Sequence, residues 1–205
     1  MSIEHWDRIY STRAVESVGW YEPDPLVSRR LVTEAIARGA GSLVDIGGGA
    51  SSLVDHVLDL GLERIAVIDI SEAGLEVARR RLAPRADEVE WGVGDVSSMA
   101  DIGQFDIWHD RAVFHFLLDA TARRQYARLA ERTIPVGGEA IVATFAADGP
   151  ERCSGLPVHR YEPEALAEEC GPAFRLTGSV RYLHHTPAGI AQSFQYATFD
   201  RVALA

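Results

Sequence analysis

The sequence contains no long run of apolar residues. No stretch approaches the roughly 18 consecutive apolar residues that a membrane-spanning helix needs, so we expect no insertion into a membrane. The first seven residues have neither the basic start nor the apolar centre of a secretory signal, which favours a cytoplasmic location. Internal repeats, low-complexity tracts and visible linkers are also missing, and 205 residues suit a single domain.

The sequence also has few cysteines and no excess of positive charge. The two cysteines, Cys153 and Cys170, match no metal-ligand spacing and make no disulfide framework, so we expect no metal site, and the role of Cys153 stays open. The formal net charge is −10, from 20 basic and 30 acidic residues. Non-specific affinity for nucleic acid comes mainly from clustered Lys and Arg, so RNA or DNA partners are not expected.

A glycine-rich turn is the most informative part of the chain. The apolar run 43–46, interrupted by Asp45, meets three glycines at 47–49, and helically spaced apolar residues follow at 53–58. This pattern predicts a buried strand, a tight turn and a helix. Glycines let the backbone adopt positive φ and approach a ligand closely. A purely connective turn is the alternative interpretation.

Two acids sharpen the prediction. The next apolar run, 65–68, ends in Asp69, about 20 residues after Gly49, where a nucleotide-binding unit places the acid that binds ribose hydroxyls. Asp45 lies at the tip of the first strand, where it would repel the pyrophosphate of a nicotinamide or flavin dinucleotide. It would attract the ammonium and sulfonium groups of S-adenosylmethionine. The sequence therefore favours S-adenosylmethionine as the cofactor.

The pattern Asp45-x-Gly47-x-Gly49-x-Ser51 resembles the first motif of class I S-adenosylmethionine-dependent methyltransferases, commonly Asp/Glu-x-Gly-x-Gly-x-Gly. The link 132–138 similarly resembles the Leu-x-Pro-Gly-Gly connection before the fifth strand of that family. The resemblance covers essentially the whole chain. It implies an α/β fold, a Rossmann-like doubly wound sheet of seven strands that is mostly parallel, with the last strand antiparallel and helices on both faces.

Within one domain, residues 1–41 are expected to form an N-terminal lid and helix, 42–145 the cofactor-binding half, and 146–205 a substrate-side loop, a helix and an antiparallel pair. Asp24 and Pro25 are expected to start a helix that ends at Gly39. Further helices are expected at 71–84, 119–133 and 162–170, and strands at 43–46, 65–68, 89–93, 105–108, 139–145, 174–185 and 192–202.

The resemblance implies the cofactor-binding residues. The acid after the third strand would accept a hydrogen bond from the adenine amino group, and its apolar neighbour would pack on the ring. The tip of the fourth strand would line the methionine end, because ligands gather at the carboxyl ends of parallel strands. The residues expected at the cofactor are Asp45, Ile46, Gly47, Gly48, Gly49, Asp69, Ile70, Gly94, Asp95, Val96, His109 and Asp110.

Catalytic and acceptor residues are less well marked. Asp110 and His115 are weak candidates for catalysis, and a histidine in an apolar stretch is more often a core residue. The aromatic segment 1–23 either anchors on the core or roofs the pocket, and the polar connection 146–161 is either a specificity segment or a surface loop. The residues expected near the acceptor are Trp20, Tyr21, Arg111, Phe145, His159, Arg160 and Tyr161.

The resemblance implies transfer of the sulfonium methyl group to a nucleophile, with S-adenosylhomocysteine as the product. A small-molecule acceptor is favoured by the short chain, the acidic charge and the covering N-terminal segment. A protein lysine is the alternative, because Asp110-Arg111 followed by Ala112 and a nearby Phe faintly resembles a turn of some protein-lysine methyltransferases. A non-catalytic S-adenosylmethionine-binding module is the third interpretation.

Overall fold

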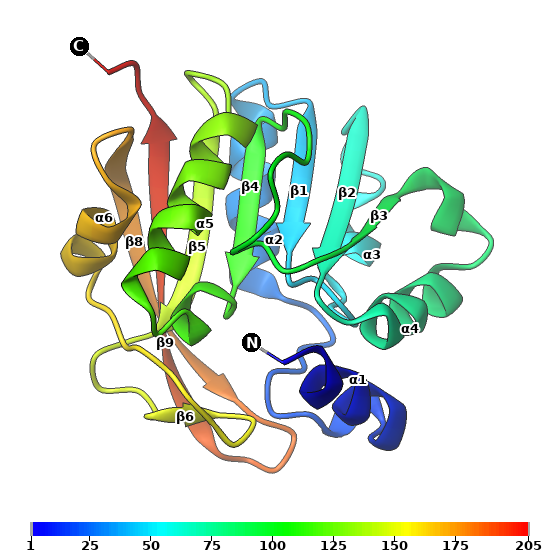
Figure 1. Cartoon of the computed structure of the whole chain (residues 1–205). Coiled ribbons are helices and arrows are strands. Elements are labelled where there is room, and N and C mark those ends of the chain that lie inside the picture. The colour runs from blue at the N-terminus through cyan, green and yellow to red at the C-terminus, as the bar shows by residue number, and fades with distance from the viewer. Residues whose placement is uncertain (1, 205) are drawn as a thin grey trace.

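The computed structural model describes residues 2–204 and contains a seven-stranded sheet in the order β3-β2-β1-β4-β5-β9-β8 (Figure 1). The first five strands are parallel, and β9 runs antiparallel to both β5 and β8. The expected Rossmann-like sheet is therefore confirmed. The strands are β1 Ser42–Ile46, β2 Arg64–Asp69, β3 Glu90–Val93, β4 Ile107–Arg111, β5 Glu139–Phe145, β8 Phe174–His185 and β9 Ala191–Arg201.

Helices cover both faces of the sheet, and each face has its own core. On one face, Val44, Ile46 and Trp108 pack against α5 and α6, and on the other Leu43 and Ile107 pack against α2, α3 and α4. This division follows from the alternation of side chains along each strand. No helix within residues 2–204 combines the length and apolarity needed to cross a membrane. The helices are α1 Ile3–Thr12, α2 Leu26–Ala37, α3 Leu53–Val57, α4 Glu72–Leu82, α5 Ala120–Thr133 and α6 Pro163–Cys170.

Helix starts follow the sequence in two cases and depart from it in a third. Ser71 caps α4 by accepting a hydrogen bond from Gly74 N, and Asp119 caps α5 by accepting from Thr121 N and Ala122 N. At α2 the cap position is Pro25, without a side-chain cap. Asp24 instead accepts two hydrogen bonds of 2.9 Å from Arg29, so an ion pair replaces the expected cap.

The fourth strand lies later in the chain than expected, at Ile107–Arg111 rather than 105–108. Its register places His109 opposite Asp45 and Asp110 opposite Ile46 on β1. His109 and Asp110 are thus strand residues that point to opposite faces of the sheet, and not residues of a loop at its tip.

The segment 146–161 is not the open polar loop that its composition suggests. It forms a hairpin of β6 Arg152–Cys153 and β7 Leu156–Pro157, turned at Gly155 with φ +80°. Its far end returns to the sheet, where Tyr161 N donates to Phe145 O.

The N-terminal segment lies across the carboxyl ends of the parallel strands. Figure 1 shows α1 on that side of the sheet, as it does the β6 hairpin. Trp6 and Ile9 of α1 form a small buried cluster with Val18 and Ile70, against which Leu156 of the hairpin packs. A Cβ on Gly74 would lie 2.8 Å from the Tyr10 ring, so a glycine in α4 permits the close approach of α1.

Candidate cofactor and acceptor site

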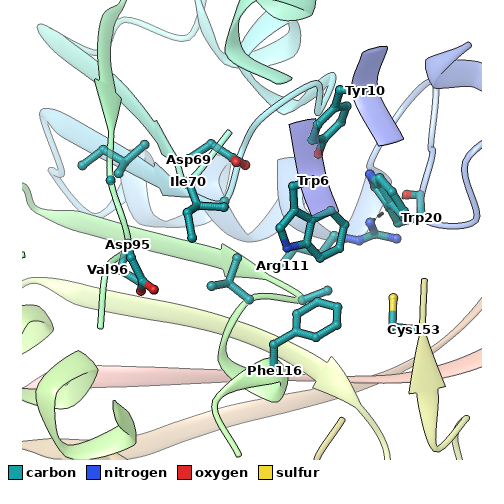
Figure 2. Close-up of a pocket in the computed structure, with 15 residues that line it drawn as sticks. Trp6, Tyr10, Trp20, Asp69, Ile70, Asp95, Val96, Arg111, Phe116 and Cys153 are labelled. Atoms are coloured by element: carbon teal, nitrogen blue, oxygen red, sulfur yellow. Dashed lines mark hydrogen bonds between the residues drawn. The ribbon is translucent and has the colours of Figure 1, made fainter. Parts of the chain in front are cut away.

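A cavity opens at the carboxyl ends of β1, β2 and β4, and its space together with the adjoining open solvent is about 620 Å³. Figure 2 shows acidic and aliphatic residues along one part of the cavity and aromatic rings along another. Its lining residues are Trp6, Tyr10, Trp20, Gly47, Ile68, Asp69, Ile70, Gly94, Asp95, Val96, Arg111, Ala112, Val113, Phe116 and Cys153.

The glycine turn packs tightly because its residues lack side chains. Gly47 has φ +66°, and a Cβ there would lie 1.9 Å from Val113 Cγ2. A Cβ on Gly49 would lie 2.7 Å from both Asp69 Oδ2 and Tyr10 Oη. The turn therefore brings its backbone to the edge of the cavity at Gly47, while Gly49 is enclosed by the side chains around it.

Asp45 lies beneath this turn and not on the cavity. Its Oδ1 accepts a hydrogen bond of 2.7 Å from His109 Nδ1, and His109 Nε2 is hydrogen-bonded to Ser28 Oγ at 2.9 Å. Both Asp45 and His109 are almost completely buried. The expectation that His109 lines the methionine end does not hold, because its side chain points to the α2 face of the sheet.

Asp69 ends β2 and lines the cavity. Its Oδ1 accepts a hydrogen bond of 2.8 Å from Ser71 N. Burial, reinforced by the nearby Asp45 and Asp7 carboxylates and opposed by this backbone bond, raises the pKa of Asp69 to about 7. The remaining oxygen of a buried carboxylate is a strong acceptor for ligand hydroxyl groups.

The residues after β3 line the same cavity as Asp69. Asp95 Oδ1 accepts hydrogen bonds from Ser97 N at 2.9 Å and Ser97 Oγ at 2.6 Å, which orient its carboxylate. The buried side chains of Ile70 and Val96 provide apolar surface beside it. Six of the residues expected at the cofactor thus line the same cavity: Gly47, Asp69, Ile70, Gly94, Asp95 and Val96.

Aromatic rings line the other end of the cavity. Trp6 packs edge-on against Trp20 at 5.6 Å and against Phe116 at 5.3 Å between ring centroids, and Tyr10 packs edge-on against Trp20 at 6.1 Å. Trp20 was expected here, whereas Trp6, Tyr10, Phe116 and Cys153 were not assigned to the site. The density of aromatic residues in 1–23 is the signal that points to the first two.

Arg111 lies beside these rings and is held on several sides. Its Nη1 donates to Trp20 O at 2.9 Å and its Nε donates to Tyr196 Oη at 3.1 Å. Its Nη2 lies 3.3 Å from Glu22 Oε2, and its guanidinium carbon lies 4.9 Å from the centroid of the Phe194 ring. Arg111, which was expected near the acceptor, thus lines the cavity beside the aromatic rings.

Neither candidate catalytic residue lines the cavity. Asp110 is fully buried on the α5 face, where it accepts hydrogen bonds from Tyr126 Oη at 2.6 Å, Val113 N at 2.8 Å and Phe114 N at 3.1 Å. Burial raises the pKa of Asp110 to about 6. Burial and, to a lesser extent, Arg111 lower the pKa of His115 to about 3, so His115 is a neutral core residue.

The other residues expected near the acceptor also lie elsewhere. Tyr21 lines a smaller hollow behind the cavity. Phe145 is buried inside β5, and Tyr161 packs on Phe114 beneath the sheet end. The reason is the hairpin, which turns the chain back so that 159–161 runs beside the end of β5: His159 N donates to His115 O, and Arg160 pairs with Glu151.

Comparison with known proteins supports the expected fold and enzyme class. A family model described as a methyltransferase domain matches residues 44–138, the stretch that carries the glycine turn, Asp69 and Asp95. This part of the chain is therefore similar to a methyltransferase domain. The match agrees with the expected S-adenosylmethionine-dependent methyltransferase.

Solved structures share the fold at low sequence identity. One is 1,6-didemethyltoxoflavin-N1-methyltransferase from Burkholderia thailandensis, with bound 1,6-didemethyltoxoflavin and S-adenosylhomocysteine. It is 19% identical, with 98% of this chain and 84% of that chain covered and a TM-score of 0.70. Another is the N-methyltransferase NodS from Bradyrhizobium japonicum with S-adenosylhomocysteine, at 16% identity, 85% coverage of each chain and a TM-score of 0.67.

A third structure comes from work on the conversion of a disulfide bond into a thioacetal group during echinomycin biosynthesis. It is 16% identical to this chain, with 98% of this chain and 91% of that chain covered and a TM-score of 0.78. No curated protein sequence matches the chain. Among residues 2–204, no group of three or more His, Cys, Asp or Glu side chains is arranged to hold a metal ion.

Proposed function

We propose that this enzyme transfers the methyl group of S-adenosylmethionine to a small-molecule acceptor bound at the aromatic end of the cavity. The observation that carries this proposal is the roof of the cavity. Trp6, Tyr10 and Trp20 come from the N-terminal segment and Cys153 from the β6 hairpin, and these two segments meet in one buried cluster through Leu156. A roof built in this way favours a compact acceptor over a folded protein surface.

The residues at the other end fit S-adenosylmethionine. Asp69 has a carboxylate oxygen that can accept from the ribose hydroxyls, and Asp95 is oriented to accept from the adenine amino group, with Ile70 and Val96 packing on the ring. Gly47 leaves room where any Cβ would collide with Val113, so the backbone can approach the methionine part closely. Asp45 would act through the turn, which it supports from below, and not by direct contact.

The cofactor supplies an electrophilic methyl group on sulfur, so the chain has to align the acceptor and exclude water. Tyr10 and Cys153, two titratable groups that line the aromatic end of the cavity, offer no general base near neutral pH. Burial raises the pKa of the Tyr10 hydroxyl well above its ordinary value and that of the Cys153 thiol to about 11. An acceptor that is already nucleophilic, such as a carboxylate, phenolate or neutral amine, suits this site.

The named neighbours support the same class of acceptor. The Burkholderia enzyme has bound 1,6-didemethyltoxoflavin, a small molecule, and the chain matches that structure over 98% of its own length. Because the identity is only 19%, the shared fold supports a pocket of this kind and does not name the acceptor.

Methyl-labelled S-adenosylmethionine and a cell extract test the proposal. After incubation with the enzyme, the label should appear in the fraction that passes a small-pore filter. The fraction of large molecules should remain at the level of the no-enzyme control. Label found mainly in protein would favour the lysine alternative, and no transfer to either fraction would favour a binding module without turnover.

A further inference from the structure

Two hydrogen-bond donors at the aromatic end of the cavity have no hydrogen-bond partner within residues 2–204. They are Trp6 Nε1 and Arg111 Nη2. Trp6 is 8% exposed, and the Arg111 side chain is 12% exposed. Buried polar groups in folded proteins are nearly always hydrogen-bonded, so two donors without a hydrogen bond in one cavity wall require an explanation. Both groups donate and cannot accept, so their complement is an oxygen with lone pairs.

Arg111 shares its ion-pair partner with a second group. Among residues 2–204 that partner is Glu22, which lies at 3.3 Å and also accepts a hydrogen bond of 3.0 Å from His184 Nδ1. Glu22 further interacts with the Tyr182 hydroxyl, and Arg111 keeps an Nη2 that is aligned with neither oxygen of Glu22. Glu22 thus fixes the position of the guanidinium, and the guanidinium can still bind an anion through Nη2.

The aromatic rings around these two donors determine which ligand shape fits there. The rings of Trp6, Trp20 and Phe116 meet edge to face at 76° and 77°, an arrangement that leaves ring faces of different orientation around the hollow (Figure 2). A planar ligand ring can stack or pack edge-on against such surfaces. The acids Asp69 and Asp95 lie at the other end of the cavity and would repel an anion there.

We propose that the methyl acceptor is a planar molecule that carries a carboxylate, and that Arg111 and Trp6 select it by binding that carboxylate. The inference rests on the proposed function, since it names the acceptor class of the same cavity. Glu22, Tyr196 and the Trp20 carbonyl act as positioning groups that orient the Arg111 guanidinium. A neutral analogue of the acceptor leaves both donors unpaired and binds more weakly.

Benzoate and benzamide test the proposal, because they have the same shape and differ in charge. Calorimetry on the enzyme saturated with S-adenosylhomocysteine should show benzoate binding about tenfold more tightly than benzamide, as one charge-assisted hydrogen bond predicts. Arg111→Gln should bind benzoate about tenfold more weakly and should no longer distinguish the two compounds. Trp6→Phe should weaken benzoate about threefold, and Arg111→Lys should fall between wild type and Arg111→Gln.

Arg160→Gln is the matched control, because Arg160 pairs with Glu151 and lies outside the lining of the cavity. It should bind benzoate like wild type. Binding of 5′-methylthioadenosine, which lacks the amino-acid part of the cofactor, shows that each variant keeps its fold and its adenosine site. Equal binding of the two compounds to wild type, no binding of benzoate, or unchanged benzoate binding in Arg111→Gln would overturn the inference.

Arg111→Gln could instead weaken S-adenosylhomocysteine while leaving 5′-methylthioadenosine unchanged. That result would assign Arg111 to the carboxylate of the cofactor and would also overturn the inference. Failure of the wild-type enzyme to bind S-adenosylhomocysteine at all would count against the proposed function itself. The two failures are therefore distinguishable in one set of titrations.

Discussion

Replacement of Asp69 gives the sharpest test of the cofactor end of the cavity. One of its oxygens accepts from Ser71 N and the other lies beside the glycine turn, so the carboxylate is available to the ribose hydroxyls. Hydrogen bonds to a charged acceptor contribute about 1.5–3 kcal/mol, of which part is recovered by water in the variant. Asp69→Ala should therefore weaken S-adenosylhomocysteine by about 1–3 kcal/mol, or about 5- to 150-fold.

The pH dependence of binding sharpens the same prediction. The pKa of Asp69 is raised to about 7, so the carboxyl group is largely protonated below that pH. The ribose hydroxyls need the ionised form as acceptor, so affinity should rise with pH between about 6 and 8 and then level off. Asp69→Asn keeps the size of the side chain and should bind with a pH-independent, weaker affinity over that range.

Stability should change in the opposite direction. A carboxyl group whose folded pKa is raised favours the folded state at low pH, and this contribution is lost as pH rises through about 7. Asp69→Asn should therefore raise the melting temperature of the free enzyme more at pH 8 than at pH 5. Calorimetric titration and thermal unfolding at these pH values measure both effects. Unchanged affinity for S-adenosylhomocysteine in a folded Asp69→Ala variant would refute the assignment of the ribose site.

Three further predictions concern the roof and the core. Removal of residues 1–13, which include α1, should leave a folded enzyme that binds the cofactor weakly but no longer transfers the methyl group to its acceptor. The reason is that an open site admits water. Full activity of the truncated enzyme would show that α1 contributes only to packing. Asp110→Ala should lower the free energy of unfolding by about 3 kcal/mol, since two buried donors and one part-buried donor lose their acceptor, and denaturant unfolding measures it. A change below about 1 kcal/mol would show that these bonds are not structural. His115→Gln should keep methyl transfer within about threefold of wild type, whereas a loss of about a hundredfold or more would restore His115 as a catalytic base.

The fold could be predicted from the sequence because several local signals agree. Apolar runs of strand length alternate with helically spaced segments, and the three glycines separate the first strand from its helix. The acid at Asp69 could be placed on the cavity by its spacing alone, because the end of a parallel strand defines a position at the ligand edge of the sheet. The prediction for Asp95 came from the resemblance to the methyltransferase family, which implies an acid just after the third strand.

The residues of β4 show why the positions of some candidate site residues could not be predicted from the sequence. The pattern from Phe105 to Trp108 predicts that the strand ends where two polar residues follow in succession, His109 and Asp110. The strand continues because both side chains find buried partners far away in sequence, Asp45 and Ser28 for His109 and Tyr126 for Asp110. Such pairings depend on tertiary packing, so the face on which each side chain lies could not be derived from local pattern.

The contacts of the segment 146–161 could not be predicted for a related reason. Its polar composition leaves open a specificity segment or a surface loop, and Leu156 and Cys153 turn inward because the aromatic N-terminal segment offers them an apolar surface. The hairpin therefore contributes Cys153 to the cavity, while His159 and Arg160, which looked more suited to acceptor binding, are used to anchor its end. The N-terminal segment and the β6 hairpin pack against each other, and the sequence pattern of either segment alone does not predict this contact.

Calorimetric titration of the wild-type enzyme with S-adenosylhomocysteine and, separately, with NAD tests the central claim most directly. The acid beneath the glycine turn and the cavity-lining acids Asp69 and Asp95 suit an adenosine joined to an amino acid and disfavour a pyrophosphate. S-adenosylhomocysteine should bind with one molecule per chain, and NAD should show no comparable binding. NAD binding as tight as that of S-adenosylhomocysteine, or no binding of S-adenosylhomocysteine, would contradict it.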